Sequence, residues 1–293
     1  MVTQRTGMLH AFLAYAIWGL FPLYFKQLKG VDAFEVIAHR TLWSLVVLLL
    51  ILTLLRRWAW VGPALKNPRL VGSFALSALL LSGNWLMYVW AVQTGHVVES
   101  SLGYFINPLV SVALGYVVLG ERPRRLQWAA VGLAAAGVLW LTVSAGRLPW
   151  IALVLAVSFG FYGLMRKTAA LGALEGLTLE TLLLAPVAAI ALGLWTAQGH
   201  SAFVTASPTV IGWLLLAGPL TAVPLLLFAS GARRITLTML GLMQYIAPTL
   251  QFTIGVWVYG EPLTATRLIG FAMIWTALAA YSLEGLWRSR LSA

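Results

Sequence analysis

Apolar residues form ten long stretches along the chain, and short polar segments separate them. The stretches cover residues 8–26, 34–55, 70–93, 101–119, 126–143, 150–165, 174–198, 209–232, 236–259 and 265–286. A helix of about 17 to 25 apolar residues is long enough to cross the hydrocarbon core of a bilayer. The pattern therefore predicts an all-α polytopic membrane protein with ten transmembrane helices.

Composition agrees with this pattern, since 61% of the residues are hydrophobic and only 9% are charged. Soluble domains carry about 25% charged residues. The net charge of +11 does not indicate nucleic-acid binding, because the basic residues lie in the short loops between spans. With the N-terminus inside, fourteen of the 19 Lys and Arg residues fall on the cytoplasmic side and four on the other. This bias follows the positive-inside rule and predicts that both termini are cytoplasmic.

The chain also contains an internal repeat at an offset of 140 residues. Segments 101–121 and 241–261 share seven identical positions, where residue frequencies give about two. The shared motif is Pro, six residues, Gly, four residues and Gly-Glu, and it starts at Pro108 and at Pro248. Two halves are predicted, 1–145 and 146–293. Each half holds five spans, so the second enters the membrane inverted, as in many secondary transporters.

Within this motif, the prolines and the Gly-Glu pairs have both structural and functional interpretations. Pro108 and Pro248 interrupt helix hydrogen bonding, which produces either a hinge beside a cavity or a plain kink. The Gly-Glu pairs favour a turn in which Gly120 ends one helix and Glu121 caps the start of the next. A gating role is the alternative for the pairs.

Several strings resemble the RarD family, in the EamA-like branch of the drug/metabolite transporter superfamily. They are AYAIWGLFPLYFK (14–26), EVIAHRTLWS (35–44), GNWLMYVWA (83–91), ESSLGYFINPL (99–109), FGFYGLMRK (159–167) and QYIAPTLQF (244–252). The resemblance extends over essentially the whole chain. It implies two inverted five-helix EamA-type repeats in a multi-pass protein of the bacterial cytoplasmic (inner) membrane.

The implied function is secondary-active permease activity by alternating access. Relatives in the superfamily move amino acids and other small metabolites, so the expected substrate is an amino-acid-like metabolite or a drug-like compound. The expected surroundings are membrane lipids, with a coupling proton as an option. Direction of transport and the choice between monomer and homodimer stay open.

Two charged residues lie well inside spans. Arg40 and Glu180 are repeat mates, and each is six residues into its span, about 9 Å from its membrane face. Because such charges are costly in a bilayer and mark functional sites, we expect both to face one central cavity. The alternative is that Arg40 extends to the outer face beside Glu35, and Glu180 to the inner headgroups near Arg166.

Further candidate substrate contacts are polar or aromatic side chains inside spans. One group consists of polar residues, for which interhelical hydrogen bonding is the alternative: Asn84, Tyr88, Asn107, Gln244 and Tyr245. The other lies in the first span and its short repeat mate, where interrupted helices point to a binding site and plain packing is the alternative. It consists of Trp18 and Tyr162 as substrate contacts, with Pro22 and Gly163 as hinges alongside Pro108 and Pro248.

Neither a cofactor nor a metal is expected, and the chain is not expected to be an enzyme. A membrane-embedded lipid-modifying enzyme needs clustered metal ligands, and the nearest groups are Asp32, Glu35 and His39, and the pair His96 and Glu99. Both groups are interpreted as solvated rim residues. A structural or receptor-like membrane protein is the third possibility, and the inverted duplication disfavours it.

Overall fold

The computed structural model describes residues 2–94, 97–144, 146, 150–260 and 264–291, and in that part the chain forms helices joined by short turns. The helices of the first half are α1 (Val2–Gly19), α2 (Phe21–Gln27), α3 (Ala33–Leu54), α4 (Val61–Leu65), α5 (Pro68–Gln93), α6 (Val97–Val117) and α7 (Arg125–Ser144). Those of the second half are α8 (Trp150–Thr168), α9 (Ala173–Ala197), α10 (Ala202–Thr205), α11 (Pro208–Ala232), α12 (Leu237–Met243), α13 (Ile246–Trp257) and α14 (Ala265–Leu291).

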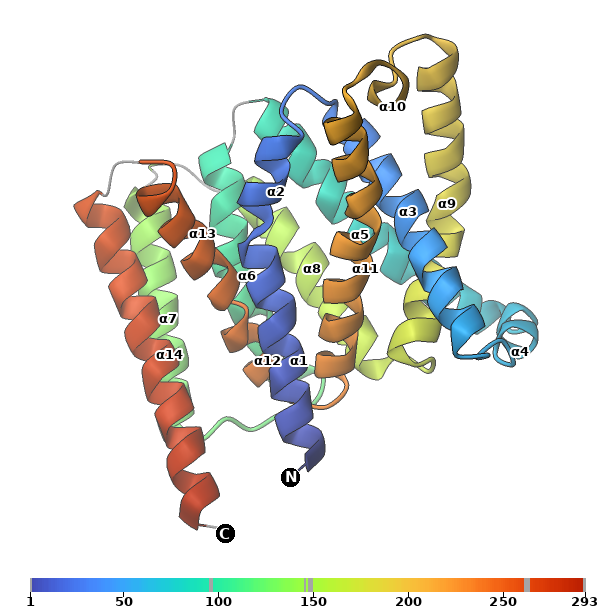
Figure 1. Ribbon diagram of the computed structural model, residues 1–293. Helices are drawn as coiled ribbons and strands as arrows, with labels where there is room; N and C mark the ends of the chain where they lie inside the picture. The colour runs from blue at the N-terminus through green and yellow to red at the C-terminus, as the bar shows by residue number, and fades with distance from the viewer. Residues whose placement is uncertain (1, 95–96, 145, 147–149, 261–263, 292–293) are drawn as a thin grey trace.

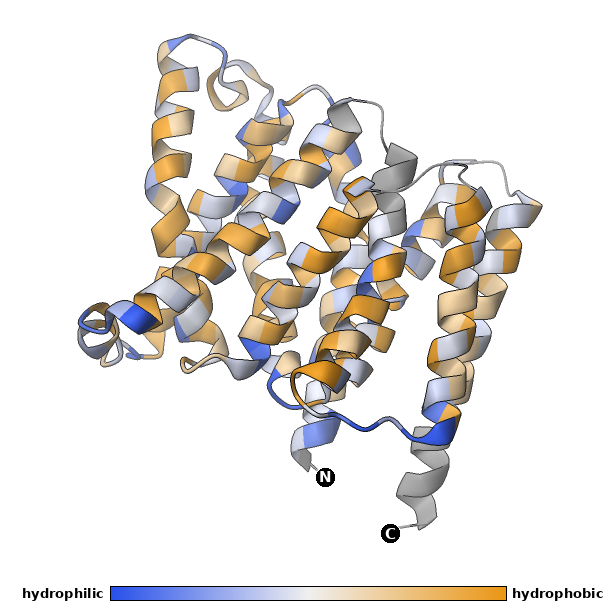
Figure 2. Ribbon diagram, turned by 180° about the vertical axis from the view of Figure 1, so that it is seen from behind, coloured by the Kyte–Doolittle hydropathy of each residue, from blue (hydrophilic) through white to orange (hydrophobic). Residues whose placement is uncertain are grey.

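Seven helical stretches within the described residues are long and apolar enough to cross a membrane. They are Thr3–Gln27, Ala33–Leu54, Pro68–Ala91, Arg125–Ser144, Trp150–Thr168, Ala173–Ala197 and Pro208–Ala232. The other three predicted spans are also helical: they fall on α6, on α12 with α13, and on α14. The all-helical architecture of a polytopic membrane protein is therefore present. The helices are largely hydrophobic along their length, and hydrophilic residues gather at the loops (Figure 2).

The helices run roughly side by side, and α1 begins at the same end of the bundle at which α14 ends (Figure 1). Helix α3 packs against both α9 and α11, while α5 packs against α8 and α9. Next to them, α1 packs against α11 and α13, and α6 packs against α8 and α12. The pair α7 and α14 forms one edge.

Close contacts recur between corresponding positions of the two halves. A Cβ atom at Gly19 would lie 2.7 Å from the Cβ of Leu250, and one at Gly160 would lie 2.7 Å from Cγ1 of Val110. Gly19 and Gly160 are repeat mates, and so are Val110 and Leu250. Glycine at both positions lets the backbones of α1 and α8 approach their neighbours closely.

Two of the predicted spans are broken, and a proline accounts for each break. The first span is interrupted at Leu20, with Pro22 in the first turn of α2. The ninth is interrupted at Gln244 and Tyr245, with Pro248 in the first turn of α13. A proline lacks the N–H that would bond the carbonyl four residues earlier, and its ring clashes with that carbonyl. The carbonyl freed by Pro22 belongs to Trp18, and it accepts a hydrogen bond of 3.2 Å from Nε2 of Gln251.

The repeat mates of these broken spans are continuous helices. Pro108 lies inside an unbroken α6, and Gly163 lies inside an unbroken α8, where it is buried against Phe228. Neither residue forms a hinge in this conformation, although both are predicted hinges. The two halves thus have similar sequences and different helix geometry.

Glu121 occupies a different position from the predicted one. Its carboxylate accepts hydrogen bonds from the backbone N–H groups of Leu237 (2.6 Å) and Thr238 (2.9 Å) and from the Thr238 hydroxyl (2.7 Å). It therefore caps α12 in the other half of the chain, not α7, the next helix. Gly120 turns the chain with a φ of 66°, and a Cβ atom at Gly115 would lie 2.6 Å from Oε2 of Glu121. The mate Glu261 lies outside the described residues.

Candidate functional site

A cavity of about 450 Å³ lies inside the bundle and is the main candidate for a binding site. Its walls come from α1, α2, α3, α5, α6, α8, α11 and α13, and so from both halves of the chain. One end reaches the exposed loop between α2 and α3, at Lys29 and Gly30. Pockets of about 300 to 1,000 Å³ accommodate small organic molecules.

A layer of buried aromatic residues packs behind Tyr15, which lines the cavity. Tyr15 contacts the ring of Phe228 at a centroid distance of 6.1 Å, and Tyr162 stacks on the same ring at 5.8 Å. The Tyr15 hydroxyl donates a hydrogen bond of 3.0 Å to the carbonyl of Leu240. All three rings are almost completely buried. Leu240 belongs to α12, the helix whose start is capped by Glu121.

Most of the predicted site residues line this cavity. Those that do are Trp18, Pro22, Arg40, Asn84, Tyr88, Asn107, Gln244 and Pro248. The others lie elsewhere in the bundle: Pro108, Tyr162, Gly163, Glu180 and Tyr245. Tyr245 is buried and donates a hydrogen bond of 3.1 Å to the carbonyl of its own repeat mate, Phe105.

Arg40 is buried in the wall of the cavity and does not extend toward Glu35. Its Nε donates a hydrogen bond of 2.9 Å to Oγ1 of Thr221. Its guanidinium lies over the ring of Trp85 at 4.6 Å and near the rings of Phe21 (5.4 Å) and Phe25 (5.7 Å). Such aromatic faces attract a cation. No carboxylate forms an ion pair with Arg40 within the described part of the chain.

The amide side chains in the cavity divide into two kinds. Asn84 donates to the carbonyl of Leu155 (2.8 Å), and Asn107 donates to that of Ala156 (2.9 Å), so both tie their helices to α8. This is interhelical hydrogen bonding, the alternative to substrate contact for these two residues. Gln244 lies in the break between α12 and α13 and lines the cavity. Its side chain makes no hydrogen bond to any residue that the structure describes.

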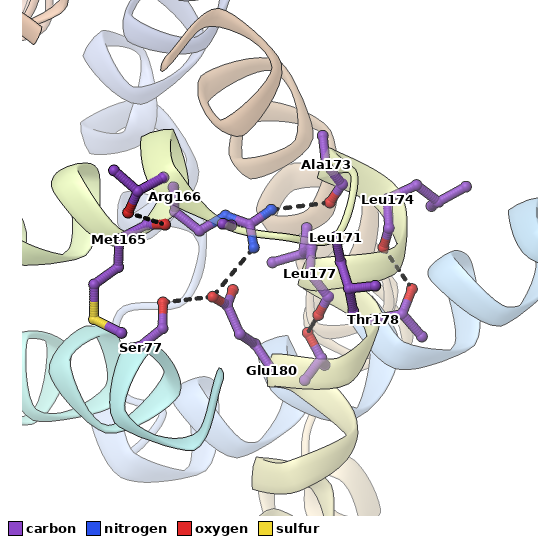
Figure 3. Close-up of polar contacts among 12 residues, drawn as sticks. Ser77, Met165, Arg166, Leu171, Ala173, Leu174, Leu177, Thr178 and Glu180 are labelled. Carbon is purple, nitrogen blue, oxygen red and sulfur yellow. Dashed lines mark hydrogen bonds and ion pairs between the residues drawn. The ribbon is translucent and has the colours of Figure 1, made fainter. Parts of the chain in front are cut away.

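Glu180 does not line the cavity that Arg40 lines, which corrects the expectation that both face one central cavity. It forms a buried ion pair with Arg166, with Oε1 at 3.3 Å from Nη1, and accepts a hydrogen bond of 2.5 Å from Ser77 (Figure 3). Arg166 also donates to the carbonyl of Ala173 at 3.1 Å. The cluster joins α5, α8 and α9.

Several residues around the cavity and in the Glu180 cluster are not predicted by the sequence. Arg166 was counted as a loop charge, yet it is only 1% exposed at the end of α8. Trp85, Phe21 and Phe25 looked like ordinary apolar residues, and only the i, i+4 spacing of the two phenylalanines placed them on one face. Their role depends on α2, α3 and α5 coming together around Arg40, which local sequence does not specify.

The rim interpretation of Glu35 and His39 was wrong. Both are buried, and Glu35 accepts a hydrogen bond of 2.7 Å from Ser201 while it lies 3.8 Å from Nε2 of His39. Asp32 caps α3 through the N–H groups of Phe34 and Glu35. No group of three His, Cys, Asp or Glu side chains suited to a metal occurs among the described residues. The pair His96 and Glu99 falls outside the residues whose side chains are described.

Comparison with known proteins agrees with this architecture. The model of the EamA-like transporter family matches residues 5–143. A solved crystal structure shares the fold, with a TM-score of 0.75 and 20% identity over 99% of this chain and 100% of the other. The fold and these matches define a multi-pass membrane transporter.

Relatives with high identity specify the family. Protein RarD of Streptomyces exfoliatus is 49% identical over 99% of this chain and 92% of that protein. An uncharacterized transporter of Vibrio cholerae is 45% identical over 96% of this chain and 93% of that protein. The chain belongs to the RarD family of EamA-like transporters in the drug/metabolite transporter superfamily.

Proposed function

We propose that the protein is a secondary-active permease that moves a small organic solute across the bacterial cytoplasmic membrane by alternating access around this cavity. The observation that carries the proposal is that repeat mates line the cavity in pairs. They are Trp18 with Phe159, Trp85 with Leu225, Tyr104 with Gln244, and Asn107 with Ala247. A site at the interface of two inverted repeats is the arrangement that alternating access requires.

In the same proposal, the chain crosses the membrane ten times as two inverted five-helix units, 1–145 and 146–293, with both termini cytoplasmic. Support comes from the family match, which ends at residue 143, and from packing: α3 contacts α11, and its mate α9 contacts α5, the mate of α11. The hydrogen bond between Tyr245 and its mate Phe105 supports a two-fold axis close to these residues.

With this orientation, the described conformation is open to the outside and closed to the cytoplasm. The cavity reaches the loop at Lys29, which the positive-inside rule places outside. The ring layer of Tyr15, Phe228 and Tyr162 and the Glu121 cap on α12 lie on the cytoplasmic side. We assign substrate contact to the cavity residues Trp18, Arg40, Tyr88 and Gln244, and a structural role to Glu180.

Flux measurements test this function. Purified protein in liposomes is expected to accelerate uptake of at least one member of a panel of amino acids, amphenicols and other small metabolites above the rate in empty liposomes. Uptake with and without a pH gradient reports proton coupling. Chemical conversion of a lipid-linked substrate without solute flux would instead favour a membrane-embedded enzyme, and the absence of both would favour a receptor or structural protein.

A further inference from the structure

We propose that the cavity selects organic anions, namely a single carboxylate attached to an apolar or aromatic body, with Arg40 as the carboxylate-binding residue. This inference deepens the proposed function and rests on the cavity being its substrate site. Three observations carry it: the charges of the residues that line the cavity, the unused N–H donors of Arg40, and the aromatic side chains of the cavity walls.

Among the described residues, cations line the cavity and no carboxylate does. Arg40 and Lys29 line it, and no Asp or Glu is among its lining residues in the described part of the chain. A buried charge without a partner is costly. The other buried arginine, Arg166, has the carboxylate of Glu180 at 3.3 Å. Arg40 lacks such a partner among the described side chains, so an anionic ligand would supply the missing charge.

Arg40 also has donors left over for a ligand. Nε is bonded to Thr221, and neither terminal nitrogen makes a hydrogen bond to a described residue. The bond to Thr221 fixes the guanidinium plane beside Trp85, and a planar guanidinium binds a carboxylate through two parallel hydrogen bonds. A fixed fork that faces an open cavity is suited to a carboxylate more than to a neutral carbonyl.

The remaining walls suit an apolar or aromatic body. The rings of Tyr88 and Tyr104 contact each other at a centroid distance of 5.8 Å. Both line the cavity, as do Trp18 and Phe159. Because aromatic rings pack well against other rings, these walls favour an organic anion over inorganic phosphate. An amino acid would bring an ammonium group into a cavity that already holds two cations, so it should bind less well than the corresponding acid.

The test uses three probes with one body: 3-phenylpropionate, its neutral amide 3-phenylpropionamide, and phenylalanine. Calorimetry on the purified protein should show the acid binding about ten- to a hundredfold more tightly than the amide, the usual range for a hydrogen bond to a charged group. Phenylalanine should bind more weakly than the acid. Equal affinity for acid and amide, tighter binding of phenylalanine, or equally tight binding of inorganic phosphate would overturn the proposal.

Variants connect this selectivity to Arg40. Arg40→Gln should lower affinity for the acid to that of the amide while leaving affinity for the amide within about twofold, and Arg40→Lys should give an intermediate acid affinity. Arg122→Gln is the matched control, because its guanidinium also lies 4.6 Å from a ring, that of Tyr116, but is exposed and outside the cavity. If Arg40→Gln does not fold, two measurements decide whether Arg40 binds the carboxylate: the affinity of Arg40→Lys for the acid, and the affinities of the wild type for the three probes.

Binding and transport can fail separately in this experiment. Selective binding of the acid without flux in liposomes would rule out the permease function and support the anion-binding site. Flux of solutes with no preference for the acid, together with unchanged affinity for the acid in Arg40→Gln, would support the permease function and rule out the anion-binding site.

Discussion

At the scale of single residues, the two buried arginines show how the same side chain is stabilised in two ways. Arg166 is neutralised by Glu180 and bonded to Ala173. Arg40 is held by Thr221 and by aromatic faces, which attract a cation without neutralising it. The first arrangement has its counter-charge within the protein, and the second has room for a ligand. We therefore expect replacements of Glu180 and of Arg40 to have different consequences.

Removing the Glu180 carboxylate should destabilise the fold, because Arg166 would remain buried without its partner. Breaking a buried ion pair costs about 3 to 5 kcal/mol. Glu180→Ala should therefore lower the melting temperature of the purified protein by several degrees, measured by the loss of monodisperse protein after heating. The double variant Arg166→Met with Glu180→Leu should recover most of the loss. A Glu180→Ala protein as stable as the wild type would contradict this account.

At the scale of the elements, Glu121 couples the end of α6 to the start of α12 across the two halves of the chain. Its carboxylate accepts hydrogen bonds from backbone N–H groups at the start of α12 that have no partner within the helix. The helix dipole also favours a negative charge at this end. Gly115 and Gly120 provide the space and the turn that this position requires. This explains the fixed spacing of Gly115, Gly120 and Glu121 in the first copy of the motif.

Loss of this cap should open the cytoplasmic side. A helix cap contributes about 0.5 to 2 kcal/mol, so Glu121→Ala should increase opening about two- to thirtyfold. The natural chain has no cysteine, which permits a clean reporter at Ser111, a buried residue packed beside Gly241 between α6 and α12. Ser111→Cys should react faster with a maleimide when Glu121→Ala is added. An unchanged rate would show that the cap does not hold this side closed.

The elements also show how far the sequence could predict the structure. Hydropathy located the helical spans, because that signal is local. Pro22, Pro108 and Pro248 all carry the signal of an interruption, but only Pro22 and Pro248 lie at breaks, and Pro108 lies in a continuous helix. The partner of Glu121 and the pairing of Arg166 with Glu180 join residues from different helices. Such contacts depend on packing, which apolar composition does not encode, since lipid-facing and buried positions are equally apolar.

At the scale of the whole molecule, the two halves differ in which helices are broken. The first span and α12–α13 are interrupted, whereas their repeat mates α8 and α6 are continuous. Exchange of conformations between inverted repeats would reverse this pattern. In the opposite state α6 should break at Tyr104 and Phe105, which correspond to Gln244 and Tyr245, because Pro108 leaves the carbonyl of Tyr104 without its helical N–H donor.

This reversal predicts opposite effects for equivalent substitutions at the two prolines. Pro108→Ala restores an N–H in α6 and favours the continuous helix, so it should stabilise the described conformation and slow maleimide labelling of Ser111→Cys. Pro248→Ala lets α12 continue into α13 and should speed the same reaction. Each change acts on a helix-interior proline penalty of about 3 kcal/mol, enough to shift the rates severalfold. Shifts of the same sign would mean that the prolines only kink their helices, and that the two halves do not exchange conformations.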